Sequence, residues 1–224
     1  MPESRENDGA SGAVGILGGT FDPVHLAHLA LARTAAERLG LARVIWIPAG
    51  QPPHRPAPHA APAHRLAMTR LAIGGDARFS VDASEAVSSA ASYTVHSLER
   101  LRRQCGPDRP LVLLMGADAL RGLAGWHRWR DLFALAHIGV ATRPGFPFAS
   151  LESPVAEEFA ARRVPSADFS KPAGSIVPFD LVAGTTSATE ARALLAAGAP
   201  RAQLLELLPA PVLDYIYQHS LYRS

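Results

Sequence analysis

The fold of this chain is decided by the stretch GGTFDPVHLAH at residues 18–28. An apolar run at 14–17 precedes it and is typical of a buried strand, while the alanine- and leucine-rich run 26–39 that follows is typical of a helix. Glycines in the turn let a ligand approach the backbone, and the free N–H groups and positive dipole end of the helix favour an anion. The stretch therefore predicts a strand, a glycine turn and a helix that together bind phosphate.

Two histidines stand at the start of the predicted helix. His25 and His28 are three residues apart, so they share one helix face and can point at the same object. Each could instead be an ordinary polar group, and a metal site is a further alternative, although no carboxylate or cysteine lies at a matching spacing in this stretch. The stretch is neither a GxGxxG nor a GxxxxGK[ST] motif. We interpret the pair as phosphate ligands and expect no metal site built by the protein.

The rest of the chain alternates apolar strands with helices. Predicted strands lie at 44–48, 79–82, 111–115, 138–141 and 175–177, and predicted helices at 65–73, 93–104, 118–123, 126–135, 154–163, 189–197, 204–208 and 210–219. Continuous apolar strands between helices indicate a parallel sheet covered on both faces. The predicted fold class is α/β, a doubly wound, mainly parallel Rossmann-like sheet with a small helical C-terminal part at about 186–224.

Several loops with polar residues follow predicted strands. They are the turn 18–23, the proline-rich loop 49–64, residues 116–118 and residues 142–144. The carboxyl ends of parallel strands share one edge of the sheet, and open α/β sheets bind their ligands there. The order of elements therefore predicts one shared site.

Composition limits the classes of protein that the chain can belong to. Its 224 residues, 48% of them hydrophobic, suit a single domain, which we expect over 13–224 after a disordered polar lead at 1–12. The net charge is +2 and no long basic run occurs, so nucleic acid is not an expected partner. No apolar stretch reaches the roughly 20 residues that cross a bilayer, so we expect no membrane association. Cys105 is the only cysteine, which fits a reducing, cytoplasmic compartment. A homo-oligomer is an open alternative to a monomer.

A second candidate phosphate site lies near the C-terminal end of the sequence. Ser187 and Thr189 stand at a predicted helix start, where hydroxyls and free N–H groups bind oxyanions. Arg192 is one turn further on and can add a bidentate contact. An ordinary helix cap with a surface arginine is the alternative, but the first motif favours a second phosphate contact.

The two motifs resemble the HxxH and ISxTxxR elements of nucleotidyltransferases related to the class I aminoacyl-tRNA synthetases. Between and after them come PPHR at 52–55, ASYT at 91–94, GADAL at 116–120, GWH at 125–127, RPG at 143–145 and LPAPVLDYI at 208–216. This order is similar to that of bacterial nicotinate-mononucleotide adenylyltransferases, and the resemblance covers about residues 13–223. It implies adenylyl transfer from ATP to nicotinate mononucleotide in NAD synthesis, giving nicotinate adenine dinucleotide and pyrophosphate, with Mg²⁺ accompanying ATP.

The resemblance also implies a role for each matching residue. His25, His28 and Arg192 would be catalytic, and ATP would be bound by Gly18, Gly19, Thr20, Phe21, His25, His28, Arg143, Ser187, Thr189 and Arg192. The mononucleotide would be bound by His54, Arg55, Thr94, Asp118, Trp126 and His127. In this scheme Asp118 contacts ribose and Trp126 stacks on the nicotinate ring. The attacking phosphate oxygen is already ionised, so the reaction needs positioning and charge stabilisation and no general base.

Some positions depart from the family pattern, and two other functions stay open. Ala27 replaces a common glycine, Thr186 replaces isoleucine, and residues 49–51 (AGQ) stand where asparagine is usual. One alternative is a transferase of the same fold that acts on another acceptor such as phosphopantetheine, against which the SYT stretch and Trp126 argue. The other is a nucleotide sensor without catalysis, against which the two intact phosphate motifs argue.

Overall fold

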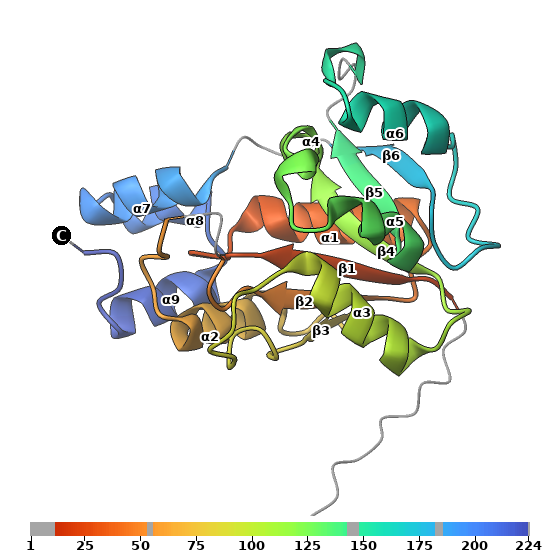
Figure 1. Ribbon diagram of the computed structural model, residues 1–224. Coiled ribbons are helices and arrows are strands. Elements are labelled where there is room, and N and C mark those ends of the chain that lie inside the picture. Colours follow the sequence, from red (N-terminus) through yellow and green to blue (C-terminus); the bar gives the residue numbers. More distant parts are fainter. Residues whose placement is uncertain (1–11, 53–55, 143–147, 182–185, 224) are drawn as a thin grey trace, which may run out of the picture.

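The computed structural model describes residues 12–52, 56–142, 148–181 and 186–223 (Figure 1). The strands in this part of the chain form one sheet in the order β3-β2-β1-β4-β5-β6, and every neighbouring pair is parallel. Their bounds are β1 Val14–Gly19, β2 Arg43–Pro48, β3 Phe79–Val81, β4 Leu111–Gly116, β5 His137–Thr142 and β6 Ile176–Asp180. The predicted doubly wound, Rossmann-like α/β fold is confirmed. The predicted lead at 1–12 falls almost wholly outside the described residues.

Helices cover both faces of the sheet because alternate residues of the central strands point to opposite sides. In β2, Val44 and Trp46 belong to one apolar cluster, while Ile45 and Ile47 belong to the other. The first cluster includes residues of α1 (Leu26–Arg38), α2 (Pro62–Ile73), α7 (Ala188–Ala196), α8 (Arg201–Leu205) and α9 (Ala210–Gln218). The second includes residues of α3 (Thr94–Cys105), α4 (Ala117–Arg121), α5 (Leu132–Leu135) and α6 (Val155–Arg162). Figure 1 shows α1 and α3 on opposite faces.

The middle of the sheet is the point at which the chain changes direction. From β1 the chain moves outward to β2 and β3, and after α3 it returns to β4 on the other side of β1. Val14 of β1 therefore pairs with Arg43 of β2 and with Leu111 of β4. Sheets of this order bind ligands in the crevice at the carboxyl ends of the two central strands. The turn 18–23 and residues 116–118 both begin there.

The C-terminal helices lie beside the end of β1 rather than over the middle of the sheet. In Figure 1 α7, α8 and α9 gather at the left with α2, on the side where β1 ends. The N–H of Leu26, the first residue of α1, donates to the carbonyl oxygen of Leu207 at 2.9 Å. This bond joins the start of α1 to the predicted C-terminal helical part. None of the helices in the described part of the chain is long and apolar enough to cross a membrane.

One predicted helix is wrong. The stretch 126–135 is not a continuous helix, because a short 3₁₀ turn at Trp129–Asp131 leads into α5, which covers only Leu132–Leu135. The preceding residue, Arg128, adopts the left-handed conformation with φ 52°. A left-handed residue cannot continue a right-handed helix, so Trp126 and His127 lie in a turn, in which the N–H of Trp129 donates to the oxygen of Trp126 at 3.2 Å.

Other element bounds differ by a few residues, each for a local reason. Helix α2 begins at Pro62 rather than 65, since proline is tolerated in the first helical turn. Strand β6 continues to Asp180 through Pro178, which an edge strand allows because one side of its backbone needs no partner. Helix α4 begins directly after β4, and α8 ends at Leu205.

Candidate active site

The glycine turn after β1 brings the backbone, and not the ring of Phe21, to the site. Phe21 has φ 49° and its ring is 2% exposed, packed against Trp46 and edge-on to His28 with centroids 5.4 and 5.0 Å apart. Gly18 and Gly19, predicted to form the turn, are instead the last two residues of β1, and a Cβ on Gly19 would lie 2.7 Å from this ring, so the end of the strand needs glycine there. Gly18 is exposed and Gly19 and Thr20 are half-buried. Of the four residues at 18–21 that are predicted to bind ATP, Phe21 can contribute only its main chain.

The two histidines come together at the start of α1, as their spacing predicts. Their ring centroids are 3.7 Å apart, and the N–H of His25 donates to Nδ1 of His28 at 3.2 Å. His25 is 7% exposed, and burial lowers the pKa of its ring to about 4, so it is neutral at pH 7. Among the described residues, none gives a hydrogen bond to its buried Nδ1. His28 is half-buried and lies nearer the surface.

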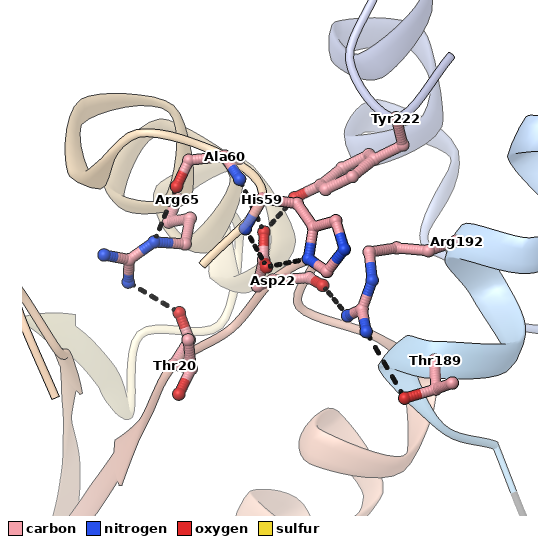
Figure 2. Close-up of polar contacts among 8 residues, drawn as sticks. All are labelled: Thr20, Asp22, His59, Ala60, Arg65, Thr189, Arg192 and Tyr222. Atoms are coloured by element: carbon pink, nitrogen blue, oxygen red, sulfur yellow. Dashed lines mark hydrogen bonds and ion pairs between the residues drawn. The ribbon is translucent and has the colours of Figure 1, made fainter. Parts of the chain in front are cut away.

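The second phosphate motif lies directly against the first. Nη1 of Arg192 donates to the carbonyl oxygen of Asp22 at 2.6 Å, and Nη2 donates to Oγ1 of Thr189 at 3.3 Å (Figure 2). Ser187 is the N-cap of α7 and accepts a hydrogen bond from the N–H of Glu190 at 3.1 Å. The fold thus joins two motifs that are far apart in the sequence.

The described residues that are predicted to bind the mononucleotide lie in two groups, near the start of α3 and at the start of α4. Tyr93 is the N-cap of α3, and its ring packs on His127 with centroids 4.5 Å apart, which brings His127 to the helix start at Thr94. Trp126 ends a 3₁₀ turn and is half-buried. Asp118, in the first turn of α4, is exposed and forms an ion pair with Arg121 at 2.8 Å. Within the described part of the chain, Asp118 forms no hydrogen bond or ion pair with Thr94 or His127.

Three predicted site residues fall outside the described parts of the chain. They are His54, Arg55 and Arg143. The last described residues before them are Pro52, which follows β2, and Thr142, which ends β5. The carboxyl ends of β2 and β5 lie at the same edge of the parallel sheet as that of β1.

A buried arginine that the sequence analysis missed holds the loops of this edge together. Arg65 in α2 has no exposed surface, and its guanidinium donates to the main-chain oxygens of Thr20 at 2.7 Å, Gly50 at 2.7 Å, Ala60 at 3.1 Å and Ala49. It therefore connects the turn after β1 with the loop after β2. A signal was present in the sequence, since position 65 shares the apolar face of α2 with Met68 and Ala72, all of them buried.

A buried carboxylate in the glycine turn was missed as well. Asp22 is 5% exposed, and its carboxylate accepts hydrogen bonds from the N–H of His59 at 2.7 Å, the N–H of Ala60 at 3.0 Å and the hydroxyl of Tyr222 at 2.7 Å (Figure 2). Burial raises the pKa of Asp22, but the hydrogen bonds from His59, Tyr222 and Ala60 outweigh it and lower this pKa below its usual value. The carboxylate is therefore ionised at neutral pH. No local pattern in the sequence points to Tyr222.

The loop after β2, where the family usually has asparagine, leaves no room for a side chain at position 50. A Cβ on Gly50 would lie 2.1 Å from the carbonyl oxygen of Glu85. The N–H of Gly50 donates to Oγ of Ser92 at 2.9 Å, and the N–H of Ser92 donates to the oxygen of Gln51 at 3.0 Å. The loop packs so closely on residues 85–92 that a side chain at position 50 would displace it.

Comparison with known proteins agrees with this fold. The cytidylyltransferase-like family matches residues 16–193, a span that contains both phosphate motifs, and the chain belongs to this family. Within curated proteins it is 54% identical over 217 residues to the probable nicotinate-nucleotide adenylyltransferase of Dechloromonas aromatica, covering 94% of this chain and 98% of that protein. A protein of the same name from Laribacter hongkongensis is 49% identical, with 95% of each chain covered. The family resemblance found in the sequence is confirmed.

Solved structures with little sequence identity share the fold. Nicotinic acid mononucleotide adenylyltransferase from Plasmodium falciparum, complexed with APC, has a TM-score of 0.69 at 15% identity, with 94% of this chain and 97% of that chain covered. The same enzyme complexed with NaAD has a TM-score of 0.68 at 14% identity. The arrangement of sheet and helices is therefore that of a known nucleotidyltransferase.

Proposed function

We propose that this chain transfers the adenylyl group of ATP to nicotinate mononucleotide and forms nicotinate adenine dinucleotide and pyrophosphate, a step of NAD synthesis. One observation carries the proposal: Arg192 of the second phosphate motif donates to the main chain of Asp22 in the first, at 2.6 Å. Two helix starts that each attract anions thus serve one site. The names of the relatives at 54% and 49% identity support this choice of substrates.

In the proposed reaction, an ionised phosphate oxygen of the mononucleotide attacks the α-phosphorus of ATP. A new P–O bond forms, the bond to the β-phosphate oxygen breaks, and pyrophosphate leaves with the electron pair. His25 is neutral and offers one N–H rather than a charge. Positive charge for the transition state comes from Arg192 and the helix N-termini. The main chain of Gly18, Gly19, Thr20 and Phe21, the side chains of His28, Ser187 and Thr189, and Arg143 complete the ATP side of the site.

The mononucleotide occupies the other side of the crevice in this proposal. The first N–H groups of α3, at Thr94, have no partner within the helix and suit the nicotinate carboxylate. Trp126 stacks on the ring, with His127 beside it, and Asp118 contacts ribose. His54 and Arg55 bind the mononucleotide phosphate.

Mg²⁺ accompanies ATP in this proposal. The carboxylate of Asp22 is already engaged by His59, Ala60 and Tyr222, and the other groups around it are imidazole and guanidinium rather than the oxygens that Mg²⁺ prefers. The described parts of the chain contain no group of three or more His, Cys, Asp or Glu side chains placed to hold a metal ion. An ion that is bound by the ATP phosphates and by water, and neutralises charge on them, fits these residues.

We further propose that residues 13–224 act as one nucleotidyltransferase domain in the cytoplasm, where ATP is available, with ATP and nicotinate mononucleotide as partners and without nucleic acid. The bacterial sources of the relatives support this placement.

The acid and amide forms of the mononucleotide test the proposed substrate. We expect kcat/KM, measured by pyrophosphate release, to be about 100-fold higher for nicotinate mononucleotide than for nicotinamide mononucleotide. A backbone donor that faces the amide N–H₂ is left unpaired, and each such mismatch costs about 1–3 kcal/mol. Trp126→Ala should raise KM for both substrates by similar factors, because stacking does not distinguish them.

Each other outcome of this assay points elsewhere. Equal kcat/KM for the two mononucleotides would indicate a dual-specificity enzyme. Turnover of ATP with phosphopantetheine, but with neither mononucleotide, would identify a transferase with another acceptor. ATP binding without pyrophosphate release from any acceptor would indicate a sensor.

Removal of the Arg192 side chain tests the second motif. We expect Arg192→Ala to raise KM for ATP far more than KM for the mononucleotide, because a lost charged contact costs about 1.5–3 kcal/mol. Steady-state kinetics with each substrate varied in turn measures this. Arg201→Ala is the control, since Arg201 forms an exposed ion pair with Asp214 on α9 and should leave both KM values unchanged. Unchanged KM and kcat in Arg192→Ala would refute the assignment.

A further inference from the structure

We propose that Tyr222 is a positioning residue for ATP, which acts through the carboxylate of Asp22 on the main chain that orients Arg192. The inference rests on the proposed function and adds a residue outside every motif described above. Its basis is the hydrogen bond from the Tyr222 hydroxyl to Oδ1 of Asp22, at 2.7 Å. Figure 2 shows Tyr222 above the carboxylate, with Arg192 on the other side of the same residue.

The carboxylate of Asp22 joins three segments of the chain. Its partners are His59 and Ala60, which lie just before α2, and Tyr222, which lies beyond α9. An ionised carboxylate that is 5% exposed is stable only where donors surround it. Oδ1 of Asp22 accepts hydrogen bonds from the Tyr222 hydroxyl and from the N–H of Ala60. Loss of the hydroxyl therefore leaves Oδ1 with only the N–H of Ala60 among these donors.

The main chain of the same residue holds the phosphate-binding arginine. The carbonyl oxygen of Asp22 accepts from Nη1 of Arg192 at 2.6 Å, while that of Thr20, two residues earlier, accepts from Arg65 at 2.7 Å. The intervening Phe21 has a left-handed backbone, with φ 49°, and a ring fixed in the core. The carboxylate and the carbonyl group belong to the same residue, so a shift of the Asp22 backbone that follows the loss of a carboxylate donor also moves the oxygen that accepts from Arg192. The position of Arg192 therefore depends on how the carboxylate is held.

The surroundings of Tyr222 keep its hydroxyl protonated and in one position, so it can donate a hydrogen bond to Asp22. Burial raises the pKa of its hydroxyl, and the hydrogen bond to Asp22 raises it further, so the group stays protonated at neutral pH. Its φ is 61°, a conformation that non-glycine residues keep only where their surroundings hold them. The neighbouring Leu221 and the Tyr222 ring pack against the apolar cluster that contains α1 and α9. The hydroxyl is thus held at a fixed place above the glycine turn.

The variant Tyr222→Phe tests the proposal because it keeps the ring and removes only the hydroxyl. We expect the Kd of ATP, measured by calorimetry, and the KM for ATP to rise about 5- to 20-fold, as for a weakened charged contact. KM for the mononucleotide should change less than twofold. A merely structural role would lower the thermal midpoint and leave the Kd of ATP for the folded protein unchanged.

Tyr215→Phe is the matched control. It removes a hydroxyl of the same C-terminal region, which is hydrogen-bonded to Nδ1 of His64 at 2.9 Å and not to Asp22. Its thermal midpoint should fall to a similar extent, with the Kd of ATP unchanged. An equal loss of ATP affinity in both variants would overturn the proposal, as would unchanged affinity in Tyr222→Phe.

A double-mutant cycle tests the route through Arg192. If Tyr222 acts through Asp22 on Arg192, Tyr222→Phe should have little further effect on ATP affinity in the Arg192→Ala background. Additive effects would refute this route. The ATP measurements need no acceptor, so they decide the role of Tyr222 even if the wild-type protein fails to use nicotinate mononucleotide, in which case only the proposed function falls.

Discussion

Replacement of His28 with alanine is expected to lower kcat about 10²–10³-fold, the usual cost of removing one preorganised group that stabilises transition-state charge. His25→Ala should have an effect of the same order, because the two rings lie 3.7 Å apart at the helix start that we propose to face the reacting phosphates. Steady-state kinetics with both substrates saturating measures the change. His28 is half-buried, so the free energy of unfolding should fall far less than the activation free energy rises.

His219→Ala is the control for these variants, since His219 is exposed and stands at the end of α9. Its kcat should equal that of the wild type. Near-wild-type kcat in both His25→Ala and His28→Ala would show that the pair has a structural role only.

The buried ring of His25 also gives a pH readout for the same variant. Burial lowers the pKa of His25 from 6.5 to about 4 in the folded protein, so between these values the unfolded chain binds the proton more readily. The free energy of unfolding therefore falls as the pH falls from about 6.5 to about 4. Denaturant unfolding at pH 7 and pH 5 should show a smaller acid-induced loss in His25→Ala than in the wild type.

Replacement of Arg65 with alanine is expected to lower the free energy of unfolding by about 3–5 kcal/mol, as for other buried charged groups whose partners are left behind. The guanidinium has no exposed surface, and its loss would leave main-chain oxygens of Thr20, Gly50 and Ala60 without their donor. Urea unfolding followed by circular dichroism measures the change. KM for ATP should rise in any fraction that folds, since the same bonds fix the glycine turn.

Two further variants sharpen this test. Arg70→Ala is the control on the same helix, because Arg70 is exposed and should change stability by less than about 0.5 kcal/mol. Arg65→Lys keeps the charge but lacks the planar fork that reaches several oxygens at once, so it should rescue stability only in part. A loss of less than about 1 kcal/mol in Arg65→Ala would contradict the role assigned to this arginine.

The sequence predicts the sheet, and the edge at which the candidate site residues gather, because both depend on local patterns. Unbroken apolar runs such as 111–115 mark strands that are buried on both faces, and their alternation with helices implies the parallel order. The spacing of His25 and His28 predicts their shared face. The prediction of a helix over 126–135 is wrong because Arg128 adopts a left-handed conformation, which the local sequence does not indicate.

The contacts that organise the site are harder to predict, because they join residues far apart in the chain. Asp22 meets Tyr222 and Arg192 only after the C-terminal helices pack beside the end of β1. Phe21 stands inside a ligand-binding motif, yet its ring is in the core, and a motif does not distinguish a main-chain role from a side-chain role. Arg65 follows the apolar period of α2, but charge usually indicates the solvent face.

The central place of β1 has a consequence for the order of folding. One neighbour, β2, follows it after a single helix, but the other, β4, pairs Leu111 with Val14 and requires closure of a long loop. Such distant pairings form slowly, because the entropy of the loop is lost before the contacts are gained. A nascent chain that has completed β1, α1 and β2 already contains the histidine pair but lacks the opposite wall of the crevice. The site proposed for the nucleotide is therefore completed late, when the second half of the sheet packs on the first.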